Sequence, residues 1–246
     1  MKLYLTSSPG GSYIEEGKRI PCKLDEKNGF VEQLKQDWKQ DSNLLIISSD
    51  PKAFDINDSF REIFRKAFSF TGLSIASITI CDDRNDCELP QFMKEADVIL
   101  LAGGHVPTQN EFFERIHLKE QIHNFGGIVI GISAGSMNSA EVVYAQPELE
   151  GETIDPNYQR FLKGLGLTKL MILPHYQYLK NEMLDGKRII EDITYPDSQN
   201  RKIYALVDGS YVKIEEGRVC LYGEAYLIQD GKTQQICSEN EIFQMV

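Results

Sequence analysis

The stretch from Gly126 to Asn138 reads Gly-Gly-Ile-Val-Ile-Gly-Ile-Ser-Ala-Gly-Ser-Met-Asn. Its apolar run, Ile128–Ile132, is typical of a parallel strand that is buried on both faces. Gly-x-Ser-x-Gly begins inside this run, and small residues that can start a helix follow it. A serine on such a sharp strand-to-helix turn projects its hydroxyl above the sheet, while the flanking glycines leave room for the chain. The pattern predicts a nucleophile elbow centred on Ser133, and an ordinary turn packed with small residues is the alternative.

A second glycine-rich turn follows the predicted strand Val98–Leu101, where the chain reads Ala-Gly103-Gly104-His105. Parallel strands end at the same edge of a sheet, where the sites of α/β proteins lie. This turn is therefore expected beside Ser133, where it can offer a backbone N–H group as an oxyanion donor. Gly-x-Gly-x-x-Gly occurs at neither turn, which argues against a dinucleotide-binding fold.

A nucleophilic serine needs a base, and the chain has only four histidines. His175 follows the predicted strand Lys169–Leu173 through a proline, so it is expected at the carboxyl end of a strand. We predict that it is the base, and a buried histidine bonded to a carbonyl is the alternative. His105 is expected near the site, and the alternative to a role as the base is that it only lines the site. His117 and His123 are interpreted as surface or packing residues.

A carboxylate that holds the tautomer of the histidine would complete the site. Asp208 is favoured because it stands where the predicted strand Ile203–Val207 meets a turn, although Asp-Gly is also an ordinary hairpin turn. Glu148 is the second candidate. Glu150 and Asp155 are further candidates, and like Glu148 they lie in a loop, residues 146–157, that is interrupted by proline and glycine.

Strands and helices alternate along most of the chain, which predicts an α/β fold with a mostly parallel, doubly wound sheet and a single domain over residues 1–246. Turn signals at Asp208-Gly209, Glu216-Gly217 and Asp230-Gly231 favour a C-terminal antiparallel ribbon at one edge of the sheet. The other predicted strands are Leu44–Ile47, Leu73–Ile80, Tyr211–Ile214, Val219–Leu221 and Ala225–Ile228. The predicted helices are Gly29–Trp38, Asn57–Phe70 (capped by Asp55 or Asn57), Gln109–Ile116, Leu118–Asn124 and Lys180–Ile193.

The composition of the chain argues against some classes of binding partner. The 246 residues include 37 acidic and 26 basic side chains, and the net charge of −11 argues against nucleic acid and anionic membranes as partners. No apolar run is long enough to span a bilayer, and the N-terminus lacks the apolar core of a secretory signal. The five cysteines are scattered and include no CxxC pair, so a reduced, cytoplasmic protein is expected. Nothing calls for a metal or an organic cofactor, and a homo-oligomer is left open.

The acidic excess is uneven along the chain. No lysine or arginine occurs between Lys119 and Arg160, a segment that contains Ser133. If this segment frames the site, it should repel a substrate carboxylate and attract an amine or a guanidinium. A solvated loop that faces away is the alternative, and Arg160 could fold back to bind a carboxylate. The acidic residues of the segment are Glu120, Glu141, Glu148, Glu150, Glu152 and Asp155.

Four short motifs together resemble the dipeptidase E and cyanophycinase family of serine peptidases. They are Leu-Ala-Gly-Gly-His ending at His105, Gly-Ile-Ser-Ala-Gly-Ser around Ser133, Leu-Pro-His ending at His175, and Val-Asp-Gly around Asp208. The resemblance covers approximately Val98 to Tyr211. It implies the three-layer α/β fold of class I glutamine amidotransferases.

The resemblance also implies roles for individual residues. Ser133 would be the nucleophile, His175 the base and Asp208 the carboxylate, with an oxyanion hole formed by the N–H groups of Gly104 and Ala134. Members typically carry glutamate at the acid position and Gly-Gly-Asn at the turn, so Asp208 and His105 are departures. The serine argues against glutamine amidotransferase activity, because those relatives use cysteine at the elbow.

A small peptide is the substrate that the resemblance implies. Members of the dipeptidase E type prefer an N-terminal aspartate, and those of the cyanophycinase type cleave a polymer of aspartate and arginine. The acidic segment argues against an acidic substrate side chain here. Candidates for substrate binding are Gly103, His105, Glu148 and Arg160.

Two other functions remain open from the sequence. An α/β-hydrolase esterase would use Ser133, Asp155 and His175 in that order, but the segment between Ser133 and His175 is too short for the strands and helices of that fold, in which the histidine comes last. A catalytically inactive binding protein of the same fold is the other alternative.

Overall fold

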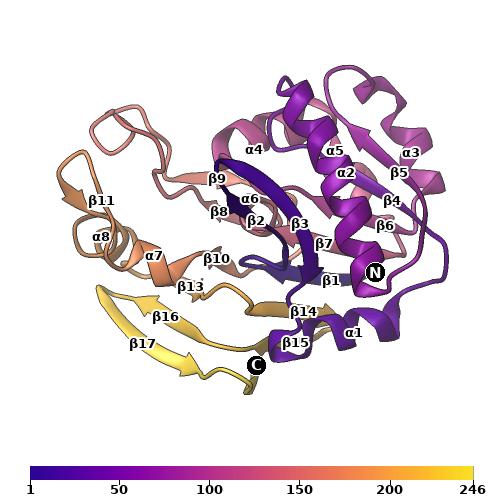
Figure 1. Ribbon diagram of the computed structural model, residues 1–246. Coiled ribbons are helices and arrows are strands. Elements are labelled where there is room, and N and C mark those ends of the chain that lie inside the picture. Colours follow the sequence, from indigo (N-terminus) through magenta and orange to yellow (C-terminus); the bar gives the residue numbers. More distant parts are fainter. Residues whose placement is uncertain (246) are drawn as a thin grey trace.

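The computed structural model describes residues 1–245, and the main sheet of this part has the strand order β18-β15-β14-β1-β7-β6-β4-β5 (Figure 1). β1, β7, β6, β4 and β5 are parallel to one another, whereas β14, β15 and β18 extend the sheet in antiparallel fashion. The strands run Lys2–Thr6 (β1), Ser42–Ile47 (β4), Ile75–Cys81 (β5), Val98–Leu101 (β6), Ile128–Ile132 (β7), Tyr211–Glu215 (β14), Arg218–Tyr222 (β15) and Ile242–Met245 (β18).

Apolar side chains leave the central strands toward both faces of the sheet, and each face has its own buried cluster. Successive residues alternate between the clusters, as the pleat of a strand requires: Leu44 and Ile46 lie in one, and Leu45 and Ile47 in the other. Helices α1 (Phe30–Asp37) and α2 (Phe54–Thr71) cover the first face. The second is covered by α3 (Leu89–Glu95), α4 (Val106–Arg115) and α5 (Leu118–Ile122). The predicted three-layer α/β fold is confirmed.

A second sheet, of order β10-β13-β16-β17, lies beside the main one, at the orange and yellow end of the chain (Figure 1). Its strands run Met171–Leu173 (β10), Lys202–Leu206 (β13), Ala225–Gln229 (β16) and Lys232–Cys237 (β17). Only β10 and β13 are parallel. Ile172 and Leu206 belong to the same buried cluster as the main sheet, so the two sheets share a core. The C-terminal ribbon therefore divides between two sheets.

The remaining elements are short. The strand pairs are Gly10–Glu15 (β2) with Lys18–Leu24 (β3), Val142–Tyr144 (β8) with Phe161–Lys163 (β9), and Met183–Leu184 (β11) with Lys187–Arg188 (β12). The remaining helices are Ala134–Asn138 (α6), Tyr176–Leu179 (α7) and Tyr195–Asp197 (α8), with 3₁₀ turns at Lys27–Gly29 and Asp86–Glu88 and a π-helix at Ile189–Thr194. No helix of the described residues is both long and apolar enough to cross a membrane.

Two expectations about elements were wrong, and one central strand was not predicted. The segment 180–193 is not one helix, because Asp185 (φ 50°) and Gly186 (φ 77°) form the turn of the β11–β12 hairpin before the π-helix begins. Neither Asp55 nor Asn57 caps α2, which starts earlier, at Phe54, with no side-chain cap. The strand β1 was not predicted at all, although it lies between β14 and β7 in the middle of the main sheet.

Candidate active site

Ser133, His175 and Asp208 meet although each comes from a different strand. Ser133 follows β7 of the main sheet, whereas His175 and Asp208 follow the neighbouring parallel strands β10 and β13 of the second sheet. Ser133 Oγ lies 3.0 Å from His175 Nε2, and His175 Nδ1 lies 2.7 Å from Asp208 Oδ1. A carboxylate can only accept hydrogen bonds, so the ring proton sits on Nδ1 and leaves Nε2 free to accept the proton of the Ser133 hydroxyl.

The backbone at Ser133 is strained, as a nucleophile elbow requires. Its φ of 48° and ψ of −111° lie outside the ordinary regions for a residue with a side chain. The flanking glycines explain how the chain passes. A Cβ on Gly131 would come within 2.8 Å of the backbone nitrogen of Ser136, and a Cβ on Gly135 would overlap the carbonyl oxygen of Leu101. Any larger residue at either position would push the start of α6 away from the strands.

The other two serines of the same segment, Ser136 and Ser139, form hydrogen bonds inside the protein. Ser136 Oγ donates to the carbonyl oxygen of Thr6 at 2.8 Å, and Ser139 Oγ donates to that of Gly135 at 2.7 Å. Both residues are fully buried. Their hydroxyl protons are used inside the protein, so these two serines do not face a substrate.

The Gly103-Gly104 turn lies directly against the elbow. A Cβ on Gly103 would come within 3.3 Å of the Cβ of Ser133, and one on Gly104 would overlap the side chain of Ser49. The turn can therefore pass this close to Ser133 because neither glycine has a side chain. Ala134, on the other side of Ser133, is the first residue of α6, and N–H groups at the start of a helix have no partner within it. Backbone N–H groups on two sides of Ser133 are the arrangement that stabilises an oxyanion.

The acidic loop, residues 146–157, is fastened to the site by His105. His105 Nδ1 lies 2.8 Å from Thr108 Oγ1, and its Nε2 lies 2.8 Å from Glu152 Oε1. The other carboxylate oxygen of Glu152 accepts hydrogen bonds from the backbone N–H groups of Glu148 and Leu149. His105 therefore holds the acidic loop from the same turn that passes Ser133.

The far side of the acidic loop is tied to the β11–β12 hairpin. Asp185 accepts hydrogen bonds from Gly151 N at 2.9 Å and from Thr153 Oγ1 at 2.8 Å, and Lys187 Nζ donates to the carbonyl oxygen of Thr153 at 2.8 Å. The hydrogen bond from the backbone N–H of Gly151, followed by those from the side chain and the backbone of Thr153, lowers the pKa of Asp185. The loop is thus held from two directions rather than free in solvent.

Glu148 is a carboxylate of the acidic loop whose pKa responds to the charge of His175. Surrounding protein atoms raise its pKa to about 7, and the charge of Glu152 adds to the effect, although the residue remains accessible to solvent. His175 acts in the opposite direction on the same carboxyl group, which means that the two side chains are within electrostatic reach. Glu148 is therefore electrostatically coupled to His175.

The other sequence candidates do not join Ser133. Arg160 pairs with Asp197 at 3.3 Å and lies over the ring of Tyr158, so its charge is already engaged. Asp155, the acid of the esterase alternative, accepts a hydrogen bond from the backbone of Asn157 two residues later. Asp208, not Asp155 or Glu148, is the carboxylate in contact with His175.

Two residues of the site were missed from the sequence. Ser7 Oγ donates to Asp208 Oδ1 at 2.6 Å, and Gln177 Oε1 accepts a hydrogen bond from the backbone N–H of Asp208 at 3.1 Å. Burial on its own raises the pKa of Asp208, but the hydrogen bond and charge of His175, followed by hydrogen bonds with Ser7 and Gln177, hold it below its usual range. The polar Thr-Ser-Ser that follows the apolar start of the chain is the signal that could have revealed Ser7, since it repeats the pattern of an apolar strand followed by polar residues.

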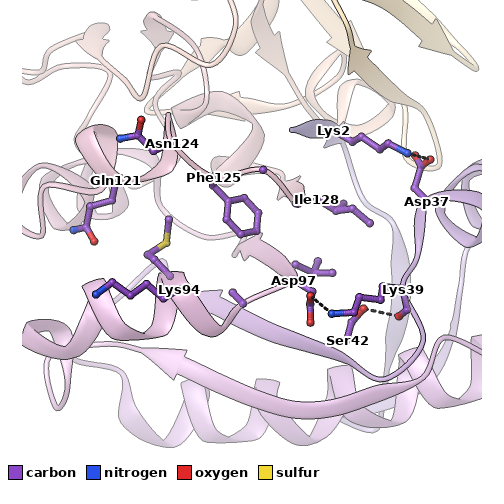
Figure 2. A pocket seen from close by; sticks show the side chains of 15 residues that line it. Lys2, Asp37, Lys39, Ser42, Lys94, Asp97, Gln121, Asn124, Phe125 and Ile128 are labelled. Carbon is purple, nitrogen blue, oxygen red and sulfur yellow. Dashed lines mark hydrogen bonds and ion pairs between the residues drawn. The ribbon is translucent and has the colours of Figure 1, made fainter.

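A cavity of about 590 Å³ lies at the opposite edge of the main sheet, where the parallel strands begin (Figure 2). Two lysines of its lining pair with carboxylates: Lys39 Nζ lies 2.8 Å from Asp97 Oδ1, and Lys2 Nζ lies 2.5 Å from Asp37 Oδ1. None of the candidate site residues lines it. Among residues 1–245 no group of three or more His, Cys, Asp or Glu side chains is arranged to hold a metal.

The chain is similar to known proteins of one peptidase family. The model of peptidase family S51 matches residues 27–222, a range that includes Ser133, His175 and Asp208. A crystal structure of a provisionally named peptidase E protein from Listeria monocytogenes EGD-e is similar, with a TM-score of 0.59 and 18% sequence identity over 96% of this chain and 98% of that one. At that identity the likeness shows the fold alone. No curated protein sequence matches.

Proposed function

The chain belongs to peptidase family S51, a family of serine-type peptidases, and on that premise we propose that Ser133 is the nucleophile of a hydrolase of small peptides, with His175 as the base and Asp208 as the orienting carboxylate. The observation that carries the proposal is the continuous set of contacts from Ser133 Oγ to His175 at 3.0 Å and from His175 to Asp208 at 2.7 Å. Both lengths are within the range in which a proton can be passed.

The first half of the reaction would form an acyl-enzyme. Ser133 Oγ attacks the peptide carbonyl carbon while its proton moves to His175 Nε2. Asp208 stabilises the imidazolium that results and does not itself take the proton. The N–H groups of Gly104 and Ala134 hold the developing oxyanion. His175 then gives its proton to the leaving amine, the C–N bond breaks, and the first product departs.

The second half would release the acyl group. Water takes the place of the leaving amine, His175 removes a proton from it, and the resulting nucleophile attacks the ester carbonyl. The Ser133 oxygen leaves and regains its proton from His175, which restores the starting state. Each oxyanion donor contributes on the order of 10²–10³ in rate, so both halves depend on the same two backbone groups.

A substrate with a cationic first residue fits the surroundings of Ser133 better than an acidic one. Two loop carboxylates support this preference: Glu152 is held by His105, and Glu148 is within electrostatic reach of His175. Arg160, the cation that could have bound a substrate carboxylate, is paired with Asp197. A negative rim repels an acidic side chain and attracts an amine or a guanidinium.

Hydrolysis of three dipeptides tests the function and the preference together. Arg-Ala, Gln-Ala and Asp-Ala are incubated with the wild type, with Ser133→Ala and with Ser77→Ala, an exposed serine on the edge strand β5. We expect cleavage in the order Arg-Ala, Gln-Ala, Asp-Ala, a loss of at least about 10³-fold in Ser133→Ala, and wild-type rates in Ser77→Ala. Equal rates in Ser133→Ala and wild type would refute the assignment of the nucleophile. Faster cleavage of Asp-Ala would refute only the charge preference.

A further inference from the structure

We propose that Ser7 is a positioning residue of this site, whose hydroxyl holds Asp208 and the backbone of His175 in the geometry that proton transfer requires. Ser7 directly follows β1, the central strand that lies between β14 and β7. It lies outside residues 27–222, the range that the family model matches. The effect of Ser7 on activity rests on the proposed function, whereas its contacts with Asp208 and His175 are seen in the structure.

The hydroxyl of Ser7 has one proton, and its direction follows from its two partners. Asp208 Oδ1, 2.6 Å away, can only accept, so the Ser7 proton points to it. The backbone N–H of His175 can only donate, so it gives its hydrogen bond, 2.8 Å long, to a lone pair of the same oxygen. One buried hydroxyl thus connects the carboxylate to the main chain of the histidine that the carboxylate orients.

His175 needs such a support because its backbone is in the left-handed region, with a φ of 59°. That region is costly for a residue with a side chain and persists only where neighbouring contacts enforce it. The hydrogen bond from His175 N to Ser7 is one such contact, and α7 begins at the next residue. If this bond is lost, the ring is free to move away from Ser133.

The residue before Ser7 makes the matching contact with the nucleophile. The carbonyl oxygen of Thr6 accepts a hydrogen bond from Ser133 N at 3.1 Å, and Thr6 Oγ1 donates to the carbonyl oxygen of Gly131 at 2.8 Å. The end of β1 therefore contacts all three residues of the site. Thr6 and Ser7 are both fully buried, with exposed fractions of 1% and 0%, so water cannot replace either contact.

The experiment compares the wild type with Ser7→Ala, Ser7→Cys and the control Ser8→Ala. Ser7→Cys preserves nearly the same volume but donates poorly, so it keeps the fold if Ser7→Ala does not. Ser8 is next in the chain and only partly buried. We expect kcat to fall about 10- to 100-fold in both Ser7 variants with KM almost unchanged, because small displacements of a catalytic group cost up to about 100-fold.

The pH profile separates positioning from folding. The Ser7 hydrogen bond helps to lower the pKa of Asp208, so we expect its removal to let Asp208 take up a proton at higher pH. The acid limb of kcat/KM should therefore move to higher pH in both Ser7 variants and stay in place in Ser8→Ala. A fall in kcat with an unmoved acid limb and a lower Tm would mean that Ser7 serves the fold alone, and would overturn the inference.

A spectroscopic measurement tests Ser7 even if no peptide is cleaved. The proton between His175 Nδ1 and Asp208 should give a far-downfield proton resonance, which His175→Gln identifies by abolishing it. We expect this resonance to shift or broaden in the Ser7 variants and to be unchanged in Ser8→Ala. Identical spectra in all four folded proteins would overturn the inference. Lack of wild-type activity on every peptide would count against the proposed function, and the spectra would still decide the role of Ser7.

Discussion

At the scale of single residues, Asp208 shows how position makes up for side-chain length. It is one methylene shorter than the glutamate that the family resemblance leads one to expect, yet Oδ1 lies 2.7 Å from His175 Nδ1. It ends up this close because β10 and β13 are neighbouring parallel strands whose carboxyl ends lie side by side. Ser7 and Gln177 then hold the short side chain and its backbone.

The raised pKa of Glu148 should make the preference for a cationic substrate depend on pH. With its pKa raised to about 7, it is largely neutral at pH 6 and largely charged at pH 8. Attraction for a cationic substrate should therefore grow as the pH rises through 7. We expect the ratio of KM for Gln-Ala to KM for Arg-Ala to increase severalfold between pH 6 and 8, and the ratio cancels effects common to both dipeptides.

Replacing Glu148 by glutamine removes the titrating group and keeps its shape. The KM ratio should then be nearly independent of pH and lower than in the wild type at pH 8. Asp155→Asn is the matched control, since Asp155 lies in the same acidic loop but is bonded to its own backbone neighbour. An undiminished pH dependence in Glu148→Gln, or its loss in Asp155→Asn, would assign the effect to another carboxylate.

At the scale of elements, the turn around Ser133 depends on two close backbone contacts, of Gly131 with Ser136 and of Gly135 with Leu101. A methyl group at position 135 would overlap the carbonyl oxygen of Leu101, which is backbone and cannot move aside cheaply. We expect Gly135→Ala to lower the free energy of unfolding by about 1–3 kcal/mol, as overpacking does, and to abolish activity because α6 shifts. Denaturant unfolding followed by circular dichroism measures the change.

Gly126→Ala is the control for the elbow variant. It lies at the start of the same segment, but a Cβ there would have nothing within 4 Å. Its free energy of unfolding should stay within about 0.5 kcal/mol of the wild type, as for most surface substitutions. A Gly135→Ala protein as stable and active as Gly126→Ala would contradict the steric account of the Gly-x-Ser-x-Gly pattern.

Local sequence signals predicted the elements whose apolar runs are bounded by turn residues. β6 and β7 have the predicted bounds, and the turns after β7, β10 and β13 carry the three residues that meet. β1 escaped prediction because Leu3-Tyr4-Leu5 is a short apolar run whose partners, Val129 and Ile214 among them, lie far away in the sequence. Ser7 was missed with it, because a serine is recognised as a support only when its partners are known.

At the scale of the whole molecule, the site lies where two sheets meet. The main sheet supplies Ser133 and, through the end of β1, Thr6 and Ser7, while the second sheet supplies His175 and Asp208. The division into two sheets could not be read from the sequence, because β13 and β14 are consecutive strands separated by a short turn and yet pair with different neighbours. That turn contains Asp208.

The net charge of −11 should act on substrate encounter as well as on the local preference. Salt screens such attraction, with a Debye length of about 30 Å at 0.01 M and about 3 Å at 1 M. We expect kcat/KM for Arg-Ala to fall severalfold between 0.02 and 0.5 M NaCl, while kcat/KM for the neutral Gln-Ala changes little. Equal salt dependence of the two dipeptides would mean that the charge has no part in substrate capture.

Covalent labelling tests whether Ser133 is a nucleophile activated by His175 and Asp208, without assuming any substrate. The wild type, His175→Gln and Asp208→Asn are treated with a fluorophosphonate, and the modified peptide is located by mass spectrometry. We expect one adduct, on Ser133, that forms at least about 10²-fold more slowly in both variants. An adduct on another serine, equal labelling rates in all three proteins, or no adduct on folded wild-type protein would contradict it.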